Sequence, residues 1–234
     1  MAAPRLKEGL AGLAAEDAGV ERLFHRREEN VCALLERFIG EIELFNAAYG
    51  LVSYSGPDEL VTRHVLDSLA PLGIICRECA ARFPALAVWE GGGGLSIADF
   101  GSGAGFPGIP LAIALPKARF TLIERKKKRS NFLQSVCAGL GLSNAVVAED
   151  AAGAVLAGAF HAVTFRAVSP LNEALEKELG RLLGENGFIA AYKGRAETAR
   201  AETRGAKGVY TARSCKVPFL DGERTMLISQ ALRR

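Results

Sequence analysis

The sequence of 234 residues has no apolar run that could form a membrane helix, since no window approaches about 18 uncharged apolar residues. Its first twenty residues carry Glu8, Glu16 and Asp17 and lack the apolar core of a signal peptide. We therefore expect a soluble cytoplasmic protein that does not contact membranes.

The chain has only five cysteines. An odd number of cysteines without a secretory signal predicts reduced thiols. Cys76 and Cys79 have the spacing of a zinc knuckle or a redox pair, but no second pair and no histidine follows at finger spacing. We favour two small side chains on neighbouring turns of one helix, and we predict no metal site.

Positive charge is concentrated in one place although the net charge is only +3. Residues 117–131 carry seven lysines and arginines against one glutamate, a local charge of +6, so the rest of the chain is slightly acidic. A basic cluster of this kind indicates a surface for a polyanion.

The first third of the chain has helical patterns. Apolar residues at spacings of three and four between 31 and 45 predict an amphipathic helix, and Asp58 is expected to cap a second helix that runs to about residue 75. A loop over 85–94 then contains four consecutive glycines. We predict that it separates an N-terminal helical extension, 1–90, from the main part of one globular unit, 91–234.

From residue 95 onward, short apolar runs alternate with helical patterns. The strand candidates are 95–100, 119–123, 144–148, 161–165 and 187–192, and helices are expected near 108–115, 125–140 and 170–183. This alternation predicts an α/β fold with a parallel sheet that is covered on both faces. Near the C-terminus a turn precedes the last strand with no helix between them, which predicts a terminal antiparallel hairpin.

A glycine-rich loop follows the first predicted strand, in the sequence Asp99-Phe-Gly-Ser-Gly-Ala-Gly-Phe-Pro-Gly108. Gly101 and Gly103 allow the backbone to bend closely around a ligand. Counted from Gly103, the spacing matches the GxGxxG pattern of dinucleotide-binding proteins. Asp99 argues against a dinucleotide, because a carboxylate repels pyrophosphate and accepts hydrogen bonds from an amino-bearing ligand.

Glu124 ends the second predicted strand, where a carboxylate can accept hydrogen bonds from both ribose hydroxyls of a nucleoside. S-adenosylmethionine has a ribose, an adenine, an ammonium and a sulfonium group but no phosphate. It fits Asp99, the glycine loop and Glu124 better than NAD does. The structural alternatives are a loop-ordering Asp99 and a solvated Glu124.

Several motifs occur together over residues 30–230. They are Arg63-His-Val-Leu-Asp-Ser68, Ile97-Ala-Asp-Phe-Gly-Ser-Gly-Ala-Gly-Phe-Pro-Gly-Ile-Pro110, Lys128-Arg129 with Phe132-Leu133, Phe165-Arg-Ala167, Lys193-Gly194 and Val217-Pro-Phe-Leu-Asp-Gly-Glu-Arg224. In these motifs the chain resembles the bacterial 16S rRNA guanine-N7 methyltransferases of the glucose-inhibited division protein B family. The resemblance implies a Rossmann-like class I methyltransferase with a mostly parallel seven-stranded sheet.

The resemblance also implies a cofactor site. Together with the reasoning from the residues, it gives the following candidates for binding S-adenosylmethionine: Asp99, Gly101, Gly103, Phe106, Glu124, Asp150, Ala151, Ala152 and Arg166. Two segments depart from the family. Asp150-Ala-Ala-Gly153 replaces an Arg-x-Glu-Glu pattern, and Tyr49-Gly-Leu-Val52 replaces Tyr-Asn-Leu-Thr.

Methylation of guanine N7 needs no general base, because N7 already carries a lone pair at neutral pH. The enzyme has to align N7 with the methyl group, and we expect Arg166 to orient cofactor or guanine, with a structural ion pair as the alternative. The candidates for RNA binding are Arg63, His64, Arg125, Lys128, Arg129 and Lys193. We expect a monomer that acts on 16S rRNA or on the small ribosomal subunit.

Two other functions stay open at this point. The first is an NAD(P)-dependent oxidoreductase that uses the GxGxxG register, although the chain lacks a suitably placed Tyr-x-x-x-Lys or relay histidine. The second is a catalytically inactive RNA-binding relative, which the changed segment after Asp150 makes conceivable.

Overall fold

The computed structural model describes residues 3–149, 157–166, 170–195, 199, 203 and 205–230. Within these residues one sheet has the strand order β3-β2-β1-β4-β5-β7-β6. Its strands are β1 (Ser96–Phe100), β2 (Arg119–Ile123), β3 (Ala145–Ala148), β4 (Phe160–Arg166), β5 (Leu183–Lys193), β6 (Tyr210–Lys216) and β7 (Glu223–Ser229). The first five pair in parallel, and β7 runs antiparallel to both β5 and β6. The predicted α/β fold, with a mostly parallel seven-stranded sheet and a C-terminal antiparallel hairpin, is confirmed.

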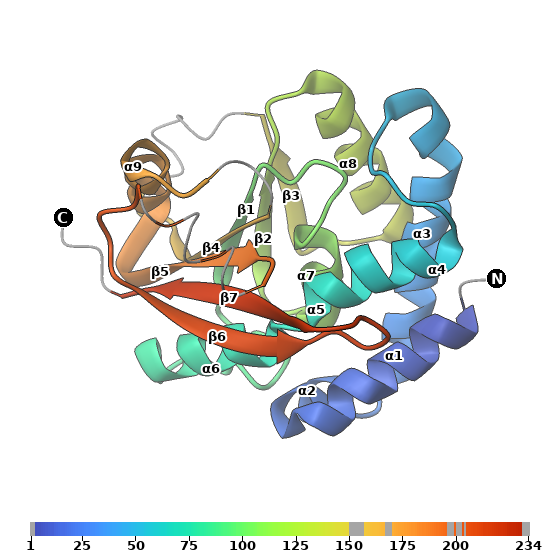
Figure 1. Cartoon of the computed structure of the whole chain (residues 1–234), viewed down its shortest axis with the longest axis horizontal. Coiled ribbons are helices and arrows are strands. Elements are labelled where there is room, and N and C mark those ends of the chain that lie inside the picture. Colours follow the sequence, from blue (N-terminus) through green and yellow to red (C-terminus); the bar gives the residue numbers. More distant parts are fainter. Residues whose placement is uncertain are drawn as a thin grey trace.

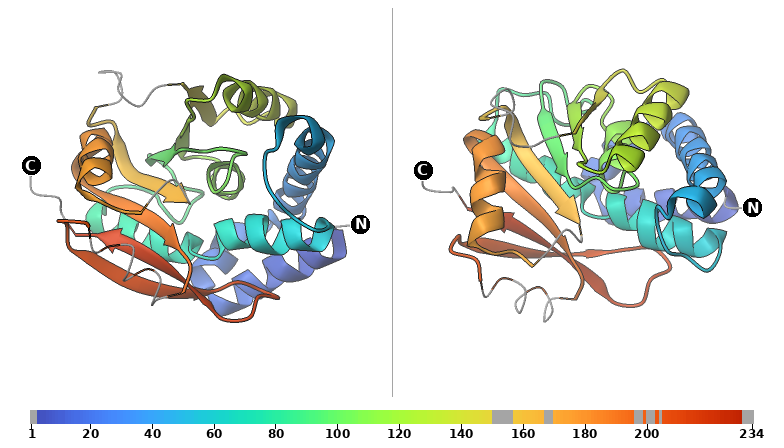
Figure 2. Two further views of the ribbon diagram at one scale, coloured as in Figure 1. Left: turned by 45° about the horizontal axis from the view of Figure 1, so that its top comes forward. Right: turned by 90° about the horizontal axis from the view of Figure 1, so that it is seen from above.

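Helices surround this sheet (Figure 1). They are α1 (Ala3–Glu16), α2 (Ala18–Phe24), α3 (Glu28–Tyr49), α4 (Pro57–Leu60), the π-helix η1 (Val61–Leu66), α5 (Asp67–Leu69), α6 (Leu72–Arg82), α7 (Gly108–Ala114), α8 (Lys127–Leu140) and α9 (Glu173–Leu182). Side chains alternate between two hydrophobic clusters along the strands: Ile97 belongs to the cluster of the N-terminal helices and α7, whereas Ala98 belongs to that of α9. Both views in Figure 2 place α9 and α3 on opposite sides of the molecule.

The predicted helix over 58–75 differs from the structure. The segment is divided into α4, η1, α5 and α6, and Pro71 stands at the N-cap of α6. A proline has no backbone N–H and its ring crowds the preceding turn, so a regular helix does not continue through it. Asp58 is not the cap: Gly56 holds that position, and the Asp58 carboxylate pairs with Arg5 at 3.2 Å.

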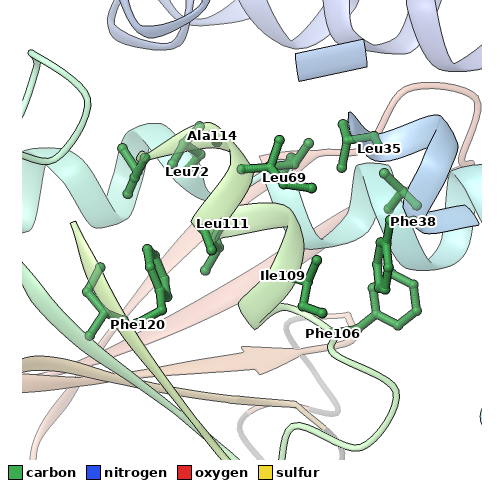
Figure 3. Packing of buried hydrophobic residues seen from close by; sticks show 14 of the residues in the cluster. Leu35, Phe38, Leu69, Leu72, Phe106, Ile109, Leu111, Ala114 and Phe120 are labelled. Atoms are coloured by element: carbon green, nitrogen blue, oxygen red, sulfur yellow. The ribbon is translucent and has the colours of Figure 1, made fainter. Parts of the chain in front are cut away.

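The N-terminal helices, of which α1 and α2 were not predicted, share their core with the sheet. Figure 3 shows Phe38 of α3 beside Phe106, just before α7, and Leu35 of α3 beside Leu69 of α5. The guanidinium of Arg27 donates to the carbonyl oxygens of Ile113 and Ala114 at 3.1 and 3.2 Å, at the C-terminal end of α7. These contacts fix the helix that follows the glycine loop.

Cys76 and Cys79 both lie on α6 and are fully buried, and all five cysteines are free thiols. Burial raises the pKa of the Cys76 thiol to about 12, which keeps it protonated. Across the described ranges, no three His, Cys, Asp or Glu side chains are grouped so that they could hold a metal ion. No helix in the same ranges has the length and apolarity to cross a membrane.

Candidate functional site

The glycine loop leaves the C-terminal end of β1 and turns directly into α7. The backbone N–H groups of Gly101 and Ser102 both donate to the carbonyl oxygen of Ile123, at 2.9 and 3.0 Å, and so attach the loop to β2. Gly101, Gly103 and Gly105 have φ angles of 70°, 60° and 95°. Residues with a Cβ rarely adopt this left-handed conformation, so the glycines are required by the path of the loop.

Asp99 lies beneath the loop and is 1% exposed. Its Oδ2 accepts hydrogen bonds from the Ser102 hydroxyl and from the N–H of Gly108 at 3.0 Å, and its Oδ1 accepts from the Thr164 hydroxyl at 3.2 Å. Burial raises the pKa of Asp99 to about 6, and the hydrogen bonds oppose that rise. The contacts favour the loop-ordering alternative over direct contact with a ligand.

Glu124 closes the loop from the other side. It is 6% exposed, so the solvated alternative is wrong. Its Oε2 accepts from the N–H of Gly103 at 2.9 Å, and its Oε1 accepts from the N–H of Lys126 at 2.8 Å. Each carboxylate oxygen has a second lone pair, so Glu124 can hold the loop and still accept hydrogen bonds from a ligand.

Phe106 ends the loop with its ring buried against the N-terminal helices. The ring centroid lies 5.1 Å from that of Phe38 (Figure 3). It also lies 5.3 Å from the ring centroid of His64 and 5.2 Å from the Arg166 guanidinium. The peptide bond between Phe106 and Pro107 is cis. The predicted cofactor contact of Phe106 stays a prediction, because its ring is engaged with helices α3 and η1.

Arg166, at the end of β4, holds the π-helix against the sheet. Its Nη1 donates to Asp67 Oδ2 at 3.1 Å and its Nη2 lies 3.2 Å from Nδ1 of His64. The Nε2 of His64 lies 3.2 Å from the carbonyl oxygen of Ser53, which can only accept. Nε2 therefore carries the proton, and Nδ1 accepts from Arg166.

The surroundings of His64 agree with this neutral tautomer. Burial and the positive charge of Arg166 lower the pKa of His64, which keeps the imidazole neutral at pH 7. Asp67 also accepts from Nε of Arg224 at 2.9 Å, so it joins β4 to β7. The ion pair proposed as the structural alternative for Arg166 is present. This ion pair does not exclude the predicted role of Arg166 in orienting a ligand, because Arg166 also lines a cavity.

The predicted RNA-binding residues lie in three places. Arg63 and His64 are on η1 beside Arg166, and Arg63 pairs with Glu59 at 3.0 Å. Arg125, Lys128 and Arg129 surround the start of α8; Lys128 donates to the carbonyl oxygen of Ala48 at 2.7 Å. Lys193, at the end of β5, is 8% exposed and its ammonium lies 5.3 Å from the ring centroid of Phe165.

A cavity of about 460 Å³ lies beside Arg166, between the ends of β4 and β5, the α5–α6 region and the β6–β7 hairpin. Its lining includes four titratable residues that the sequence analysis did not assign to a site: Asp67, Tyr192, Cys215 and Arg224. Asp67 and Arg224 belong to two of the motifs quoted above, but the sequence does not predict their contact, because 157 residues separate them. Three further predicted cofactor residues, Asp150, Ala151 and Ala152, lie outside the described residues.

Comparison with known proteins gives a consistent match. The family model described as rRNA small subunit methyltransferase G matches residues 31–227. A protein named ribosomal RNA small subunit methyltransferase G from Treponema pallidum (strain Nichols) is 37% identical over 206 residues, covering 84% of each chain. Proteins of the same name from Stenotrophomonas maltophilia (strain K279a) and Cupriavidus necator are 33% and 32% identical. Both alignments cover 96% of this chain. They cover 93% of the Stenotrophomonas protein and 92% of the Cupriavidus protein.

Proposed function

The chain belongs to the rRNA small subunit methyltransferase G family, and on this basis we propose that it methylates 16S rRNA of the small ribosomal subunit. We propose further that the methyl donor is S-adenosylmethionine and that the acceptor is N7 of one guanine. The NAD(P)-dependent alternative has no support from these relatives. The proposal extends to a monomeric cytoplasmic enzyme.

The observation that supports this cofactor is the pair of buried carboxylates around the glycine loop. Asp99 lies beneath the loop and Glu124 beside it, and both accept hydrogen bonds from loop N–H groups. A pyrophosphate needs those N–H groups and is repelled by both carboxylates. A sulfonium nucleoside has a ribose that Glu124 can bind and positive charge that the acidic surroundings favour.

S-adenosylmethionine, when bound, supplies an electrophilic methyl group: the N7 lone pair forms the new C–N bond, and the electrons of the broken C–S bond remain on sulfur. The positive charge moves from sulfonium to purine and no proton is transferred, so we name no general base. Within this reaction Gly101, Gly103 and Glu124 bind the cofactor. Arg166, held by Asp67 and His64, orients the reacting groups, which is how proximity lowers the barrier.

The basic residues around the start of α8 position the RNA. Arg125, Lys128 and Arg129 contact backbone phosphates, and Arg63 extends this surface from η1. Phosphate contacts of this kind supply affinity and register rather than sequence information. The Lys128 ammonium lies 4.7 Å from the ring centroid of Tyr49, and this contact supports the proposal because it holds one of these cations in place.

Two measurements on the full chain test the proposal. Calorimetry with S-adenosylmethionine should show binding, and Glu124→Gln should weaken it about tenfold, because the neutral amide is a poorer acceptor for ribose hydroxyls. Glu90→Gln, at an exposed position before the glycine loop, is the matched control and should bind like the wild type.

The second measurement maps 7-methylguanosine in 16S rRNA from cells with and without the protein. Loss of one modified guanine in the deletion strain is expected. If every modification persists, the substrate is wrong. If the protein also fails to bind S-adenosylmethionine, it is an inactive relative.

A further inference from the structure

The cavity beside Arg166 adjoins the glycine loop: Arg166 lines it, and the Arg166 guanidinium lies 5.2 Å from the ring centroid of Phe106 at the end of the loop. Among the described residues that line it there is none from the loop, and Glu124 is absent from its walls. Its volume of about 460 Å³ lies within the range of roughly 300–1,000 Å³ that is typical of small-molecule sites. It stands at the C-terminal ends of β4 and β5, the edge of the sheet where ligands bind in open α/β folds.

The charge of the cavity favours an anionic ligand. Arg166, Lys193 and Arg224 line it with three positive charges, and Asp67 contributes one negative charge. Asp67 accepts from both arginines, at 3.1 and 2.9 Å, so the guanidinium groups are held in place before a ligand arrives. The excess positive charge attracts phosphate.

Hydrogen-bond donors also remain on the cavity wall. Within the described part of the chain, Arg224 has a partner at Nε only, so its two terminal nitrogens can donate to a ligand. An acceptor-rich ligand matches these donors. The Tyr192 hydroxyl, in contrast, already donates to the carbonyl oxygen of Ser68 at 2.9 Å.

The other walls are apolar. Pro71 and Met226 line the cavity together with Tyr192, whose side chain is nearly buried. Apolar walls beside a few polar groups suit the flat face of a nucleobase. A base inside a folded RNA reaches such a site only when it is turned out of its stack, as enzymes that modify bases require.

We propose that this cavity receives a single guanosine nucleotide extruded from the RNA, with its base beside Met226 and its O6 and phosphate toward Arg224 and Lys193. The inference rests on the proposed function, which supplies an RNA guanine as substrate. Guanine is favoured over adenine because its O6 accepts hydrogen bonds from a donor-rich wall, whereas the adenine N6 amino group is itself a donor.

Met226 provides a direct probe, because the sequence contains only one other methionine, Met1. With the full chain labelled as [13C-methyl]methionine, guanosine 5′-monophosphate at millimolar concentration should shift the Met226 methyl resonance and leave Met1 unchanged. Adenosine 5′-monophosphate should need at least fivefold higher concentration. An unmoved Met226 resonance, or equal responses to both nucleotides, would overturn the assignment.

Gly194 allows the cavity to be blocked. It lines the cavity, and a Cβ built on it meets nothing within 4 Å. Gly194→Leu should therefore fill space without a clash, abolish the Met226 response and lower methyl transfer to RNA at least a hundredfold. Its affinity for S-adenosylmethionine should stay within twofold of the wild type. The matched control is Gly40→Leu on α3, where a Cβ also meets nothing within 4 Å, and it should behave like the wild type.

A charge variant covers the case in which Gly194→Leu does not fold. Lys193→Gln removes one cation from the cavity without adding a methionine and should weaken the nucleotide response about tenfold, while the exposed Lys177→Gln should not. If guanosine 5′-monophosphate shifts the Met226 resonance but the wild-type protein transfers no methyl group to RNA, the proposed function is wrong and the cavity assignment stands. Full transfer by Gly194→Leu would overturn the cavity assignment alone.

Discussion

Asp99 and Glu124 are adjacent in the site although they come from different strands, and each shapes the same loop. Asp99 accepts from Gly108, where α7 begins, and Glu124 accepts from Gly103 in the middle of the loop. Among the described residues, neither carboxylate forms an ion pair. The loop is therefore prearranged by acids whose charge also favours a cationic ligand, which lowers the entropy that binding must overcome.

Asp99 should give the protein a distinctive dependence of stability on pH. Its folded-state pKa of about 6 is above the ordinary 3.8, so between these values the folded chain holds this proton more tightly than the unfolded chain. Its contribution to the free energy of unfolding is therefore highest below pH 4 and declines by about 3 kcal/mol as the pH rises to 6. Urea denaturation from pH 4 to 7 measures this decline.

The variant Asp99→Asn isolates the contribution of this one group. Between pH 4 and 7 its free energy of unfolding should rise by about 3 kcal/mol relative to that of the wild type, whatever its absolute stability, because only the wild type loses the contribution of Asp99. Asp221→Asn, at an exposed position in the β6–β7 turn, is the control and should run parallel to the wild type. A constant difference between Asp99→Asn and the wild type would contradict the prediction.

At the scale of secondary-structure elements, the site depends on how closely α7 approaches the sheet. Its first residue, Gly108, has no room for a side chain: a Cβ there would overlap Leu122 Cδ2 and lie 2.6 Å from Asp99 Oδ2. The π-helix η1 is the second such element. π-Helices are rare and frequent at functional sites, and this one carries His64 to the guanidinium of Arg166.

Gly108→Ala should therefore lower the free energy of unfolding by about 1–3 kcal/mol, because the added methyl group displaces the buried neighbours of α7. It should also weaken S-adenosylmethionine binding, since Asp99 holds the loop through the same N–H. Gly139→Ala on α8 is the control: a Cβ there meets nothing within 4 Å, and stability should rise by a few tenths of a kcal/mol. Chemical denaturation of both variants decides the point, and equal effects would refute it.

At the scale of the whole molecule, the N-terminal helices and the sheet form a shared hydrophobic cluster. Leu10 of α1 and Phe38 of α3 belong to the same cluster as Ile97 of β1 and Leu111 of α7. An extension that buries its apolar side chains in this way does not have a core of its own. We infer that the two predicted parts of the chain fold together.

Unfolding should accordingly be a single cooperative transition. Trp89, the only tryptophan, lies in the loop between the two parts and packs against the shared cluster. Its fluorescence and the far-ultraviolet circular dichroism of the whole chain should have the same urea midpoint. Two separated midpoints would mean that the N-terminal helices unfold independently of the sheet. In that case Arg27→Met, which removes the hydrogen bonds from α2–α3 to α7, should leave the midpoint of the second transition unchanged.

The sequence alone predicted the positions of the first five strands, the α/β class of fold and the place of the glycine loop, because these depend on local information. Periodicity places β2 at residues 119–123 as predicted, and the glycine spacing marks the loop. It also predicted the hairpin from its turn residues. It failed for the helix over 58–75. Pro71 marks the break in the sequence itself, whereas the π-helical turn is held by Arg166 of β4, which no local pattern predicts.

Only the tertiary structure decided how the charged groups are paired. Asp67, Arg166 and Arg224 are separated by up to 157 residues along the chain, yet one carboxylate accepts from both guanidinium groups. No local pattern encodes such a contact, because it exists only after β4, β7 and the π-helix have been brought to the same edge of the sheet. The cavity could not be predicted from the sequence for the same reason, because its described lining residues come from five segments that are separate along the chain.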